Sequence, residues 1–228
     1  MAATSASNAQ RDHATAAAEV AISSLDASTL AVARRVKGFM PDDEGLALHR
    51  AGLLGAEVGP LLEIGTYCGK SAVYLGAAAR AGGSVLFTVD HHRGSEENQA
   101  GWEHHDTELV DDRTGRMDTL PVFRRSMEDA GLEDVVVAIL ASSTTVGRYW
   151  RTPLGFLFID GGHAEDVALA DYESWAGHVA PGGILAIHDV FEDPADGGQA
   201  PFRVWQRAVA DGFVPKGTTG SLRVLRHA

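Results

Sequence analysis

Short, continuous apolar runs alternate along this chain with longer segments of helical spacing, and this alternation restricts the fold more than any other feature. The runs do not alternate in polarity, which is typical of strands buried on both faces of a parallel sheet. We therefore predict an α/β, doubly wound fold in which strands and helices follow each other in turn. The predicted strands span residues 61–64, 85–89, 135–140, 156–159 and 184–187. The predicted helices between and after them span residues 70–80, 119–130, 164–179 and 202–211.

Further elements precede and follow this alternating region. Residues 29–39 and 42–55 have helical spacing and predict two leading helices, within a segment 21–57 that comes before the first strand. After the last helix, residues 212–216 and 222–225 indicate two strands joined by a Gly/Thr turn, which predicts an antiparallel hairpin. We therefore expect a mostly parallel sheet of seven strands that ends in an antiparallel hairpin.

Composition limits the class of protein. With 228 residues, of which 45% are hydrophobic and 22% charged, the chain is long enough for a single domain at 21–228 behind a flexible tail at 1–20. Its one cysteine excludes an intramolecular disulfide. A formal net charge of -12 repels phosphate backbones and anionic lipid, so we expect neither nucleic acid nor a membrane as partner. No signal-peptide pattern opens the sequence, and we expect a cytoplasmic protein.

A glycine-containing turn follows the first predicted strand and opens the next helix. Glycines there allow a tight turn and a close approach of a ligand to the backbone. Gly65 and Gly69 are separated by three residues, which does not match the G-x-G-x-x-G spacing of a dinucleotide site. The turn up to Lys70 and Ser71 is one residue too short for a P-loop, although an apolar strand ending in Asp160 resembles the Mg²⁺-binding strand of P-loop enzymes. A P-loop phosphotransferase stays open as one alternative.

A third class of ligand fits this turn better. Glu63 followed by Gly-x-x-x-Gly resembles motif I of the class I S-adenosylmethionine (SAM)-dependent methyltransferases. In that family an acidic residue ending the second strand binds the cofactor ribose, as Asp90 would here, and the adenine pocket follows the third strand, where Ser142 lies. The closing hairpin is also typical of the family, so the resemblance implies a Rossmann-like methyltransferase sheet. The cofactor contacts that it implies are Glu63, Gly65, Tyr67, Gly69, Ser71, Asp90, His91, Ser142 and Asp160.

Three motifs in the second half of the chain indicate which group of methyltransferases the chain resembles. The sequences IDGGH at 159–163, PGG at 181–183 and HD at 188–189 resemble a subfamily that includes metal-dependent O-methyltransferases of sugar hydroxyls. This resemblance implies a SAM-dependent O-methyltransferase whose acceptor is a hydroxyl of a small molecule, with a sugar or glycoside favoured, and a homodimer. A catechol-like phenol is the alternative acceptor. A non-catalytic module that only binds the cofactor is the alternative function.

Polar residues at the ends of two predicted strands are candidates for metal binding and for acid–base catalysis. Ligands bind beyond the carboxyl ends of the strands in an open α/β sheet. An aliphatic hydroxyl keeps its proton far above neutral pH, so methyl transfer to oxygen is helped by a divalent cation and by a base. We predict Asp160, His188 and Asp189 as ligands of Mg²⁺ or Mn²⁺, and His163 as the general base.

Two further features of the sequence concern the metal ligands and the substrate. His188 departs from the sugar-modifying relatives, which have glutamate at this position. Oxygen ligands suit Mg²⁺, whereas imidazole suits Mn²⁺, Fe²⁺ or Zn²⁺ better, so either the metal differs, or His188 is not a ligand, or no metal binds. The polar segment 91–118, which is rich in histidine and acidic residues and contains Trp102, is expected to be a substrate or lid loop.

Overall fold

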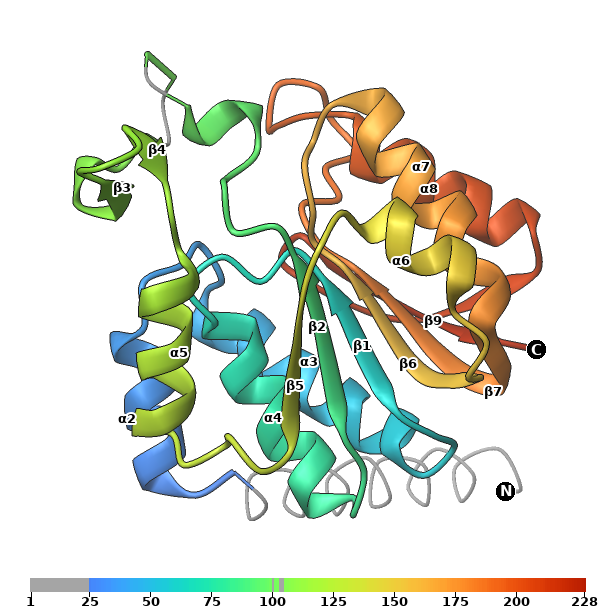
Figure 1. Ribbon diagram of the computed structural model, residues 1–228. Helices are drawn as coiled ribbons and strands as arrows, with labels where there is room; N and C mark the ends of the chain where they lie inside the picture. The colour runs from blue at the N-terminus through green and yellow to red at the C-terminus, as the bar shows by residue number, and fades with distance from the viewer. Residues whose placement is uncertain (1–24, 100, 103–104) are drawn as a thin grey trace, which may run out of the picture.

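The computed structural model describes residues 25–99, 101–102 and 105–228, so the predicted flexible tail at 1–20 lies outside the described residues. A central sheet of seven strands has the order β5-β2-β1-β6-β7-β9-β8 (Figure 1). The first five of these are parallel, whereas β9 is antiparallel to both β7 and β8, as predicted. The strands of this sheet are β1 (Leu61–Ile64), β2 (Leu86–Asp90), β5 (Val136–Leu140), β6 (Leu154–Ile159), β7 (Val179–Ile187), β8 (Phe213–Thr219) and β9 (Leu222–His227).

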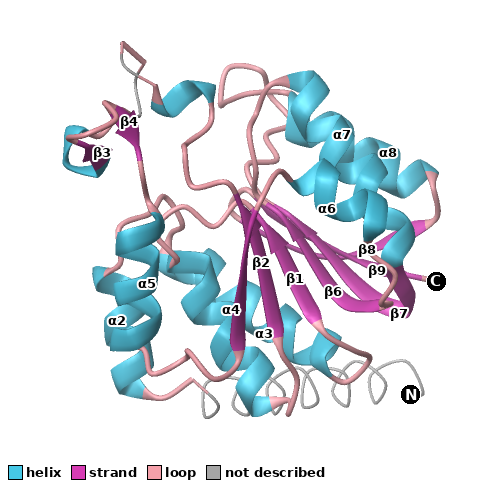
Figure 2. Cartoon of the chain, in the orientation of Figure 1, coloured by secondary structure: helices cyan, strands magenta, loops and turns pink. Residues whose placement is uncertain are grey.

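Helices cover both faces of the sheet (Figure 2). On one face they are α2 (Ala27–Arg35), α3 (Asp42–Ala56), α4 (Lys70–Ala81) and α5 (Leu120–Asp129), and on the other α6 (Ser143–Tyr149), α7 (Glu165–Trp175) and α8 (Ala200–Ala210). The two leading helices predicted before the first strand are therefore present as α2 and α3. Within the described part of the chain, none of the helices has the length and apolar character needed to cross a membrane.

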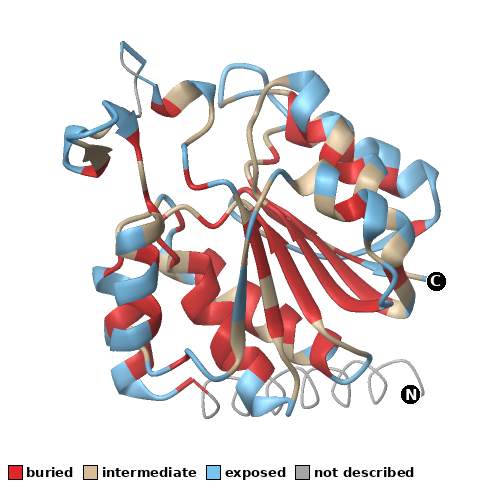
Figure 3. Ribbon diagram, in the orientation of Figure 1, coloured by how far each residue is buried: buried red, intermediate tan, exposed pale blue. Residues whose placement is uncertain are grey.

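The central strands are buried on both faces (Figure 3). Successive side chains of a strand point to opposite faces of the sheet. Leu61 and Phe158 accordingly pack in the core beneath α2–α5, whereas their neighbours Leu62 and Ile159 pack in the core beneath α6–α8. This double burial is the physical reason why the strands are continuous apolar runs in the sequence.

The register of the parallel strands aligns their carboxyl ends. Ile64 of β1 lies opposite Val89 of β2 and Ile159 of β6, and Ile159 lies opposite Ile187 of β7. The residues that follow these four positions therefore lie along one edge of the sheet. In open α/β sheets this is the edge at which ligands bind.

One predicted helix is too long. The helix expected at 164–179 is α-helical only to Trp175 and continues as the 3-10 helix η3 (Ala176–His178), because Val179 already pairs with Leu154 as the first residue of β7. As a result β7 is longer than the strand predicted at 184–187. A pairing partner more than 20 residues away in sequence overrides local helical spacing here, and no local pattern reveals it.

Helix α6 was not predicted at all. Its sequence, STTVGRY, contains β-branched residues and a glycine, which are weak helix formers. Packing stabilises it instead: the indole nitrogen of Trp175 donates a hydrogen bond to the carbonyl oxygen of Ser143 at 3.2 Å. A Cβ atom at Gly147 would lie 3.1 Å from the same indole nitrogen, so the missing side chain permits the close approach.

The loop predicted at 91–118 has short elements of its own. They are the 3-10 helices η1 (Glu96–Asn98) and η2 (Thr107–Leu109) and the two-stranded ribbon of β3 (Val110–Asp111) and β4 (Arg116–Met117). Lys37, which follows α2, forms ion pairs with Asp106 and Glu108. The loop is thus attached to the helical layer beside the carboxyl ends of the strands.

Candidate active site

The turn between β1 and α4 needs backbone conformations that glycine adopts easily. Gly65 has φ +82°, and a Cβ atom there would lie 2.1 Å from the carbonyl oxygen of Asp160. Gly69, with φ +94°, is the N-cap of α4. Since only glycine tolerates both the dihedral and the contact at position 65, this residue brings the turn after β1 against the turn after β6.

Three residues other than glycine also have left-handed backbone. Tyr67 (φ 50°), His92 (φ 57°) and Asp189 (φ 54°) follow β1, β2 and β7 respectively. Such conformations cost roughly 1–3 kcal/mol each and concentrate at functional sites. Their common position marks the carboxyl edge of the sheet as the candidate active site.

Asp90 ends β2 and holds the turn after β1 in place. Its Oδ2 accepts hydrogen bonds from the backbone nitrogens of Thr66 at 2.8 Å and Tyr67 at 2.9 Å, and its Oδ1 accepts one from the nitrogen of His92 at 2.7 Å. A carboxylate offers about four acceptor positions, so about one is left for a ribose hydroxyl. The cofactor contact of Asp90 stays a prediction. Its organisation of the turn is a function that sequence reasoning missed.

Glu63 lies on β1 directly beneath the turn and is fully buried. Neither of its carboxyl oxygens has a hydrogen-bond partner among the described residues. Burial raises the pKa of Glu63 to about 8, against a smaller opposing effect of Ser71 and Thr66. A buried acid whose oxygens have no hydrogen-bond partner, beneath a glycine turn, is typical of a group that meets a ligand, and the predicted cofactor contact of Glu63 is compatible with this.

The other predicted cofactor residues surround the same turn. Ser71 is buried in the first turn of α4, and the ring of Tyr67 packs against Phe39 with centroids 5.6 Å apart. His91 is exposed, and its Nδ1 accepts a hydrogen bond from the backbone nitrogen of Arg93 at 3.1 Å. Ser142 is exposed at the start of α6. These residues lie at the ends of β1, β2 and β5, and their contacts with a cofactor stay predictions.

Asp171 on α7 joins two of these turns. Its carboxylate accepts a hydrogen bond from the Ser143 hydroxyl, and a Cβ atom at Gly161 would lie 2.7 Å from its Oδ2. Burial raises the pKa of Asp171 to about 6, against the opposing hydrogen bond from Ser143. Asp171 therefore connects the turn after β5 with the turn after β6.

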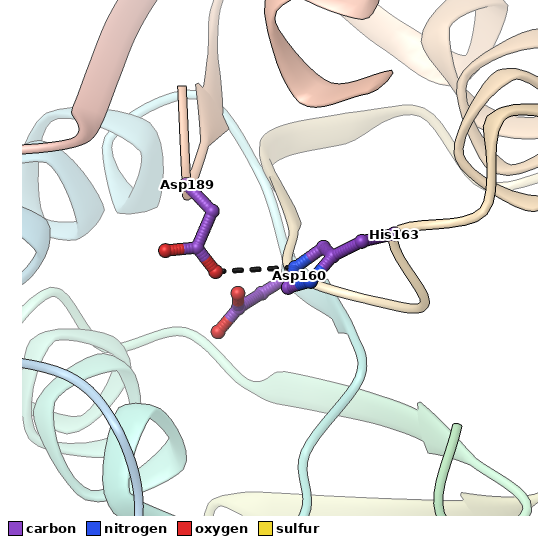
Figure 4. Close-up of side chains that lie close together, drawn as sticks. All are labelled: Asp160, His163 and Asp189. Carbon is purple, nitrogen blue, oxygen red and sulfur yellow. Dashed lines mark ion pairs between the residues drawn. The ribbon is translucent and has the colours of Figure 1, made fainter. Parts of the chain in front are cut away.

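Asp160, His163 and Asp189 come together beyond β6 and β7 (Figure 4). Their potential ligand atoms all lie within 4.8 Å of one another, and His163 Nε2 is 3.1 Å from Asp189 Oδ2. On the other side of the ring, His163 Nδ1 lies 3.1 Å from Glu97 Oε2 of η1. The hydrogen bond to Asp189 and the nearby carboxylates raise the pKa of His163 to about 9, although burial opposes them.

His188 is buried between three carboxylates. Its Nε2 lies 2.5 Å from Glu44 Oε2, and its Nδ1 lies 3.2 Å from Asp160 Oδ1 and 3.3 Å from Asp189 Oδ2. Burial alone would lower the pKa of His188, but Asp160, Asp189 and Glu44 outweigh it and raise the pKa to about 12. Burial likewise favours a raised pKa for Asp189, yet hydrogen bonds from His163 and His188 lower it well below its usual range.

The geometry adds one residue to the predicted metal set. The group of described residues that could hold a metal contains His163 together with Asp160 and Asp189. The ring of His188 lies between the same two aspartates and Glu44, and its role as a metal ligand stays a prediction. Sequence reasoning missed Glu44 because it lies on α3, 144 residues before His188. It missed Glu97 as a partner of His163 because nothing in a polar loop indicates which acid folds back onto the site.

A comparison with known protein families shows the family to which this chain belongs. A family model described as "Methyltransferase domain" matches residues 62–190, which is more than half of the 228 residues. The chain belongs to this family. The methyltransferase resemblance, the fold and the enzyme class predicted from the sequence are thereby confirmed, and the P-loop alternative loses its support. The match spans the methyltransferase from β1 through the end of β7 and includes the Asp160, His163 and Asp189 cluster.

Solved structures share the fold of this methyltransferase. The O-methyltransferase NovP is 14% identical, with a TM-score of 0.59, and the alignment covers 80% of this chain and 79% of that one. An O-methyltransferase from Bacillus cereus in complex with SAH is 18% identical, with a TM-score of 0.56 and coverage of 92% and 90%. TomG from Streptomyces achromogenes, an O-methyltransferase of tomaymycin synthesis in complex with SAM, is 18% identical, with a TM-score of 0.55 and coverage of 83% and 82%.

Proposed function

We propose that this methyltransferase uses SAM to methylate a hydroxyl group of a small molecule, with a sugar or glycoside as the favoured acceptor. The observation that carries the proposal is the cluster of His163 between Asp160 and Asp189, beside the turn at Gly65. The cluster offers a base and two carboxylates where a methyl acceptor would meet the cofactor. Two structures of the same fold, from Bacillus cereus and of TomG, contain SAH and SAM respectively.

In this mechanism His163 removes the proton of the acceptor hydroxyl. Nε2 is the atom that does so, because Nδ1 faces Glu97. Because both ring nitrogens face carboxylates, the ring carries two protons before the acceptor binds. The acceptor separates Nε2 from Asp189 and takes a position at the centre of the cluster, and Nε2 accepts the proton of the hydroxyl after it has given its own proton to solvent. When bound at the turn after β1, SAM would supply an electrophilic methyl group; the deprotonated acceptor oxygen would form the new C–O bond while the C–S bond breaks and the sulfur leaves as a neutral thioether.

The carboxylates of Asp160 and Asp189 fit a divalent cation. They are hard oxygen ligands close together at a partly open edge, as such cations require, and we propose that they hold Mg²⁺ or Mn²⁺. When bound, the ion would stabilise negative charge on the acceptor oxygen. We assign His163 the role of the base and not of a third ligand.

Calorimetry tests the cofactor. We expect SAM and SAH to bind to the purified protein, and ATP with Mg²⁺ not to bind. Asp90→Ala should weaken SAM binding at least ~10-fold, because the turn after β1 loses two hydrogen bonds to a carboxylate, His92 loses one, and the ribose loses an acceptor. Asp129→Ala, at an exposed acid on α5, is the matched control. Binding of ATP in place of SAM would reverse the assignment.

Metal removal tests the cation. Once turnover is found, treatment with a chelator should lower the rate of methylation at least ~10-fold, and added Mn²⁺ should restore it, because the ion lowers the energy of the developing alkoxide. The measurement is transfer of labelled methyl groups from SAM with and without the chelator. An undiminished rate in chelated enzyme would eliminate metal assistance while leaving SAM dependence in place.

A panel of acceptors tests the substrate class. We expect methyl ethers to form on glycosides and not on catechols, as detected by mass spectrometry after incubation with SAM. The support for a sugar is the likeness of the sequence at 159–163 to sugar-modifying enzymes, which have such a base three residues after the metal-binding Asp, as His163 follows Asp160 here. Preferential methylation of catechols would favour the phenol alternative. We further propose a cytoplasmic homodimer, which light scattering would distinguish from a monomer.

A further inference from the structure

Asp171 on α7 is a buried acid that the mechanism above does not use. The residue is only 4% exposed. Its Oδ1 accepts a hydrogen bond from the Ser143 hydroxyl, and within the described part of the chain this is the only hydrogen bond of the carboxylate. A carboxylate offers about four acceptor positions, and leaving a buried acceptor without a donor is unfavourable. Oδ2 is therefore available to a donor on a ligand.

The turns after three strands meet near this oxygen. Ser143 follows β5, and Gly161 follows β6. A Cβ atom at Gly161 would lie 2.7 Å from Asp171 Oδ2, so a side chain there would crowd the oxygen and glycine leaves it open. Burial raises the pKa of Asp171 to about 6, and Ser143 and then His91 oppose this, so the end of β2 is close enough for the charge of His91 to act here. Asp171 thus lies over the carboxyl ends of the strands between β5 and β6.

Contacts within the α6–α7 layer fix the position of the carboxylate. The indole nitrogen of Trp175, one turn further along α7, donates a hydrogen bond to the carbonyl oxygen of Ser143 at 3.2 Å. Ser143 is therefore held by α7 at both its carbonyl oxygen and its hydroxyl. A buried acceptor that is already held in place loses little conformational freedom when a ligand binds, and such a group discriminates well between ligands.

The order of the strands decides which part of SAM would reach Asp171. In the proposed function Asp90, at the end of β2, binds the ribose, and the turn after β1 binds the methionine part. The base and the methionine part are attached to opposite ends of the ribose, so the base extends from β2 away from β1. Because β2 lies between β1 and β5, this direction leads toward Ser143 and the open side of Asp171.

We propose that Asp171 is a specificity residue for the cofactor: its Oδ2 accepts a hydrogen bond from the 6-amino group of the adenine base. The inference rests on the proposed function, since it takes SAM as the cofactor. An amino group of this kind donates and a carboxylate accepts, so the two groups match. A base with hydrogen or a carbonyl oxygen at the same position offers no donor there, and the buried oxygen is then left without a partner.

Calorimetry with two ligands tests the proposal. The ligands are SAH and its purine analogue, in which a hydrogen atom replaces the 6-amino group. We expect the unsubstituted protein to bind SAH at least ~10-fold more tightly than the analogue, and Asp171→Ala to lose most of this preference. Ser143→Ala is the matched control. It removes the same hydrogen bond between α6 and α7 but keeps the carboxylate, so it should keep the preference.

The ratio of the two affinities separates recognition of the base from a structural role. If Asp171 only held α6 in place, its loss would weaken both ligands alike and leave the ratio unchanged. A ratio near one in the unsubstituted protein, or a preference that survives in folded Asp171→Ala, overturns the proposal. Asp171→Leu, which fills the volume without a polar atom, replaces the alanine variant if urea unfolding shows that the latter does not fold.

The same experiment distinguishes failure of this inference from failure of the proposed function. If the unsubstituted protein binds neither SAH nor SAM, the proposed function is wrong and the role of Asp171 falls with it. If SAH binds but the analogue binds equally well, the cofactor assignment stands and only the role of Asp171 is refuted.

Discussion

Replacement of His163 by alanine should lower the rate of methyl transfer at least ~10²-fold, the usual scale for loss of an acid–base group, and leave SAM affinity unchanged. The reason is its place in the cluster: Nε2 faces Asp189, where the acceptor hydroxyl would lie, whereas the turn that would hold the cofactor is formed by Gly65 and Asp90. Asp160→Ala should act in the same direction, because it removes a carboxylate from the same cluster. Initial rates with labelled SAM, together with calorimetry, measure the two quantities separately.

A control for this experiment lies at the opposite edge of the sheet. His178 immediately precedes β7, and its Nε2 is 3.3 Å from the carbonyl oxygen of Gly147. His178→Ala should leave the rate of methyl transfer unchanged, since no strand end with catalytic groups is nearby. If His163→Ala and Asp160→Ala both retain full turnover, the assignment of the catalytic cluster is wrong.

Substitution of Glu63 by glutamine should make the cofactor-free protein more stable at pH 8 and change its stability little near pH 4. Burial raises the pKa of Glu63 to about 8 in the folded protein, whereas in the unfolded chain the pKa is near 4.5. Between these values the folded state keeps a proton that the unfolded state releases, so the free energy of unfolding falls as the pH rises through this window. Glutamine has no such proton, and the difference should reach on the order of 4 kcal/mol at pH 8.

Urea unfolding at pH 4.5 and pH 8, without SAM, measures this effect. Glu128→Gln, at an exposed position near the end of α5, is the matched control for the loss of a carboxyl group. An equal effect of Glu63→Gln at both pH values would show that Glu63 does not retain its proton in the folded state.

The sheet could be predicted closely because its signals are local. Residues 61–64 were predicted as a strand with the bounds that β1 has, since burial on both faces requires an unbroken apolar run. The bounds of α6 and β7 could not be predicted in the same way. The weak helix formers of α6 become helical by packing against Trp175, and β7 extends back to Val179 by pairing with Leu154. Both contacts join residues that are far apart in the sequence, so no local pattern predicts them.

The amino-acid sequence by itself determined the order of the seven strands of the central sheet and of the α-helices other than α6, the glycine turn after β1 and the positions of Asp90, Asp160, His163 and Asp189 at or just beyond strand ends. Those features depend on spacing along the chain, and spacing is visible without a fold. Only the tertiary structure decided what surrounds them: Glu97 beside His163, and Glu44 with Ser221 behind His188, at separations of 66, 144 and 177 residues. The chain has 31 acidic residues, and no local sequence pattern indicates which of them will be buried against a histidine. The reason is that packing in the folded protein determines the partner.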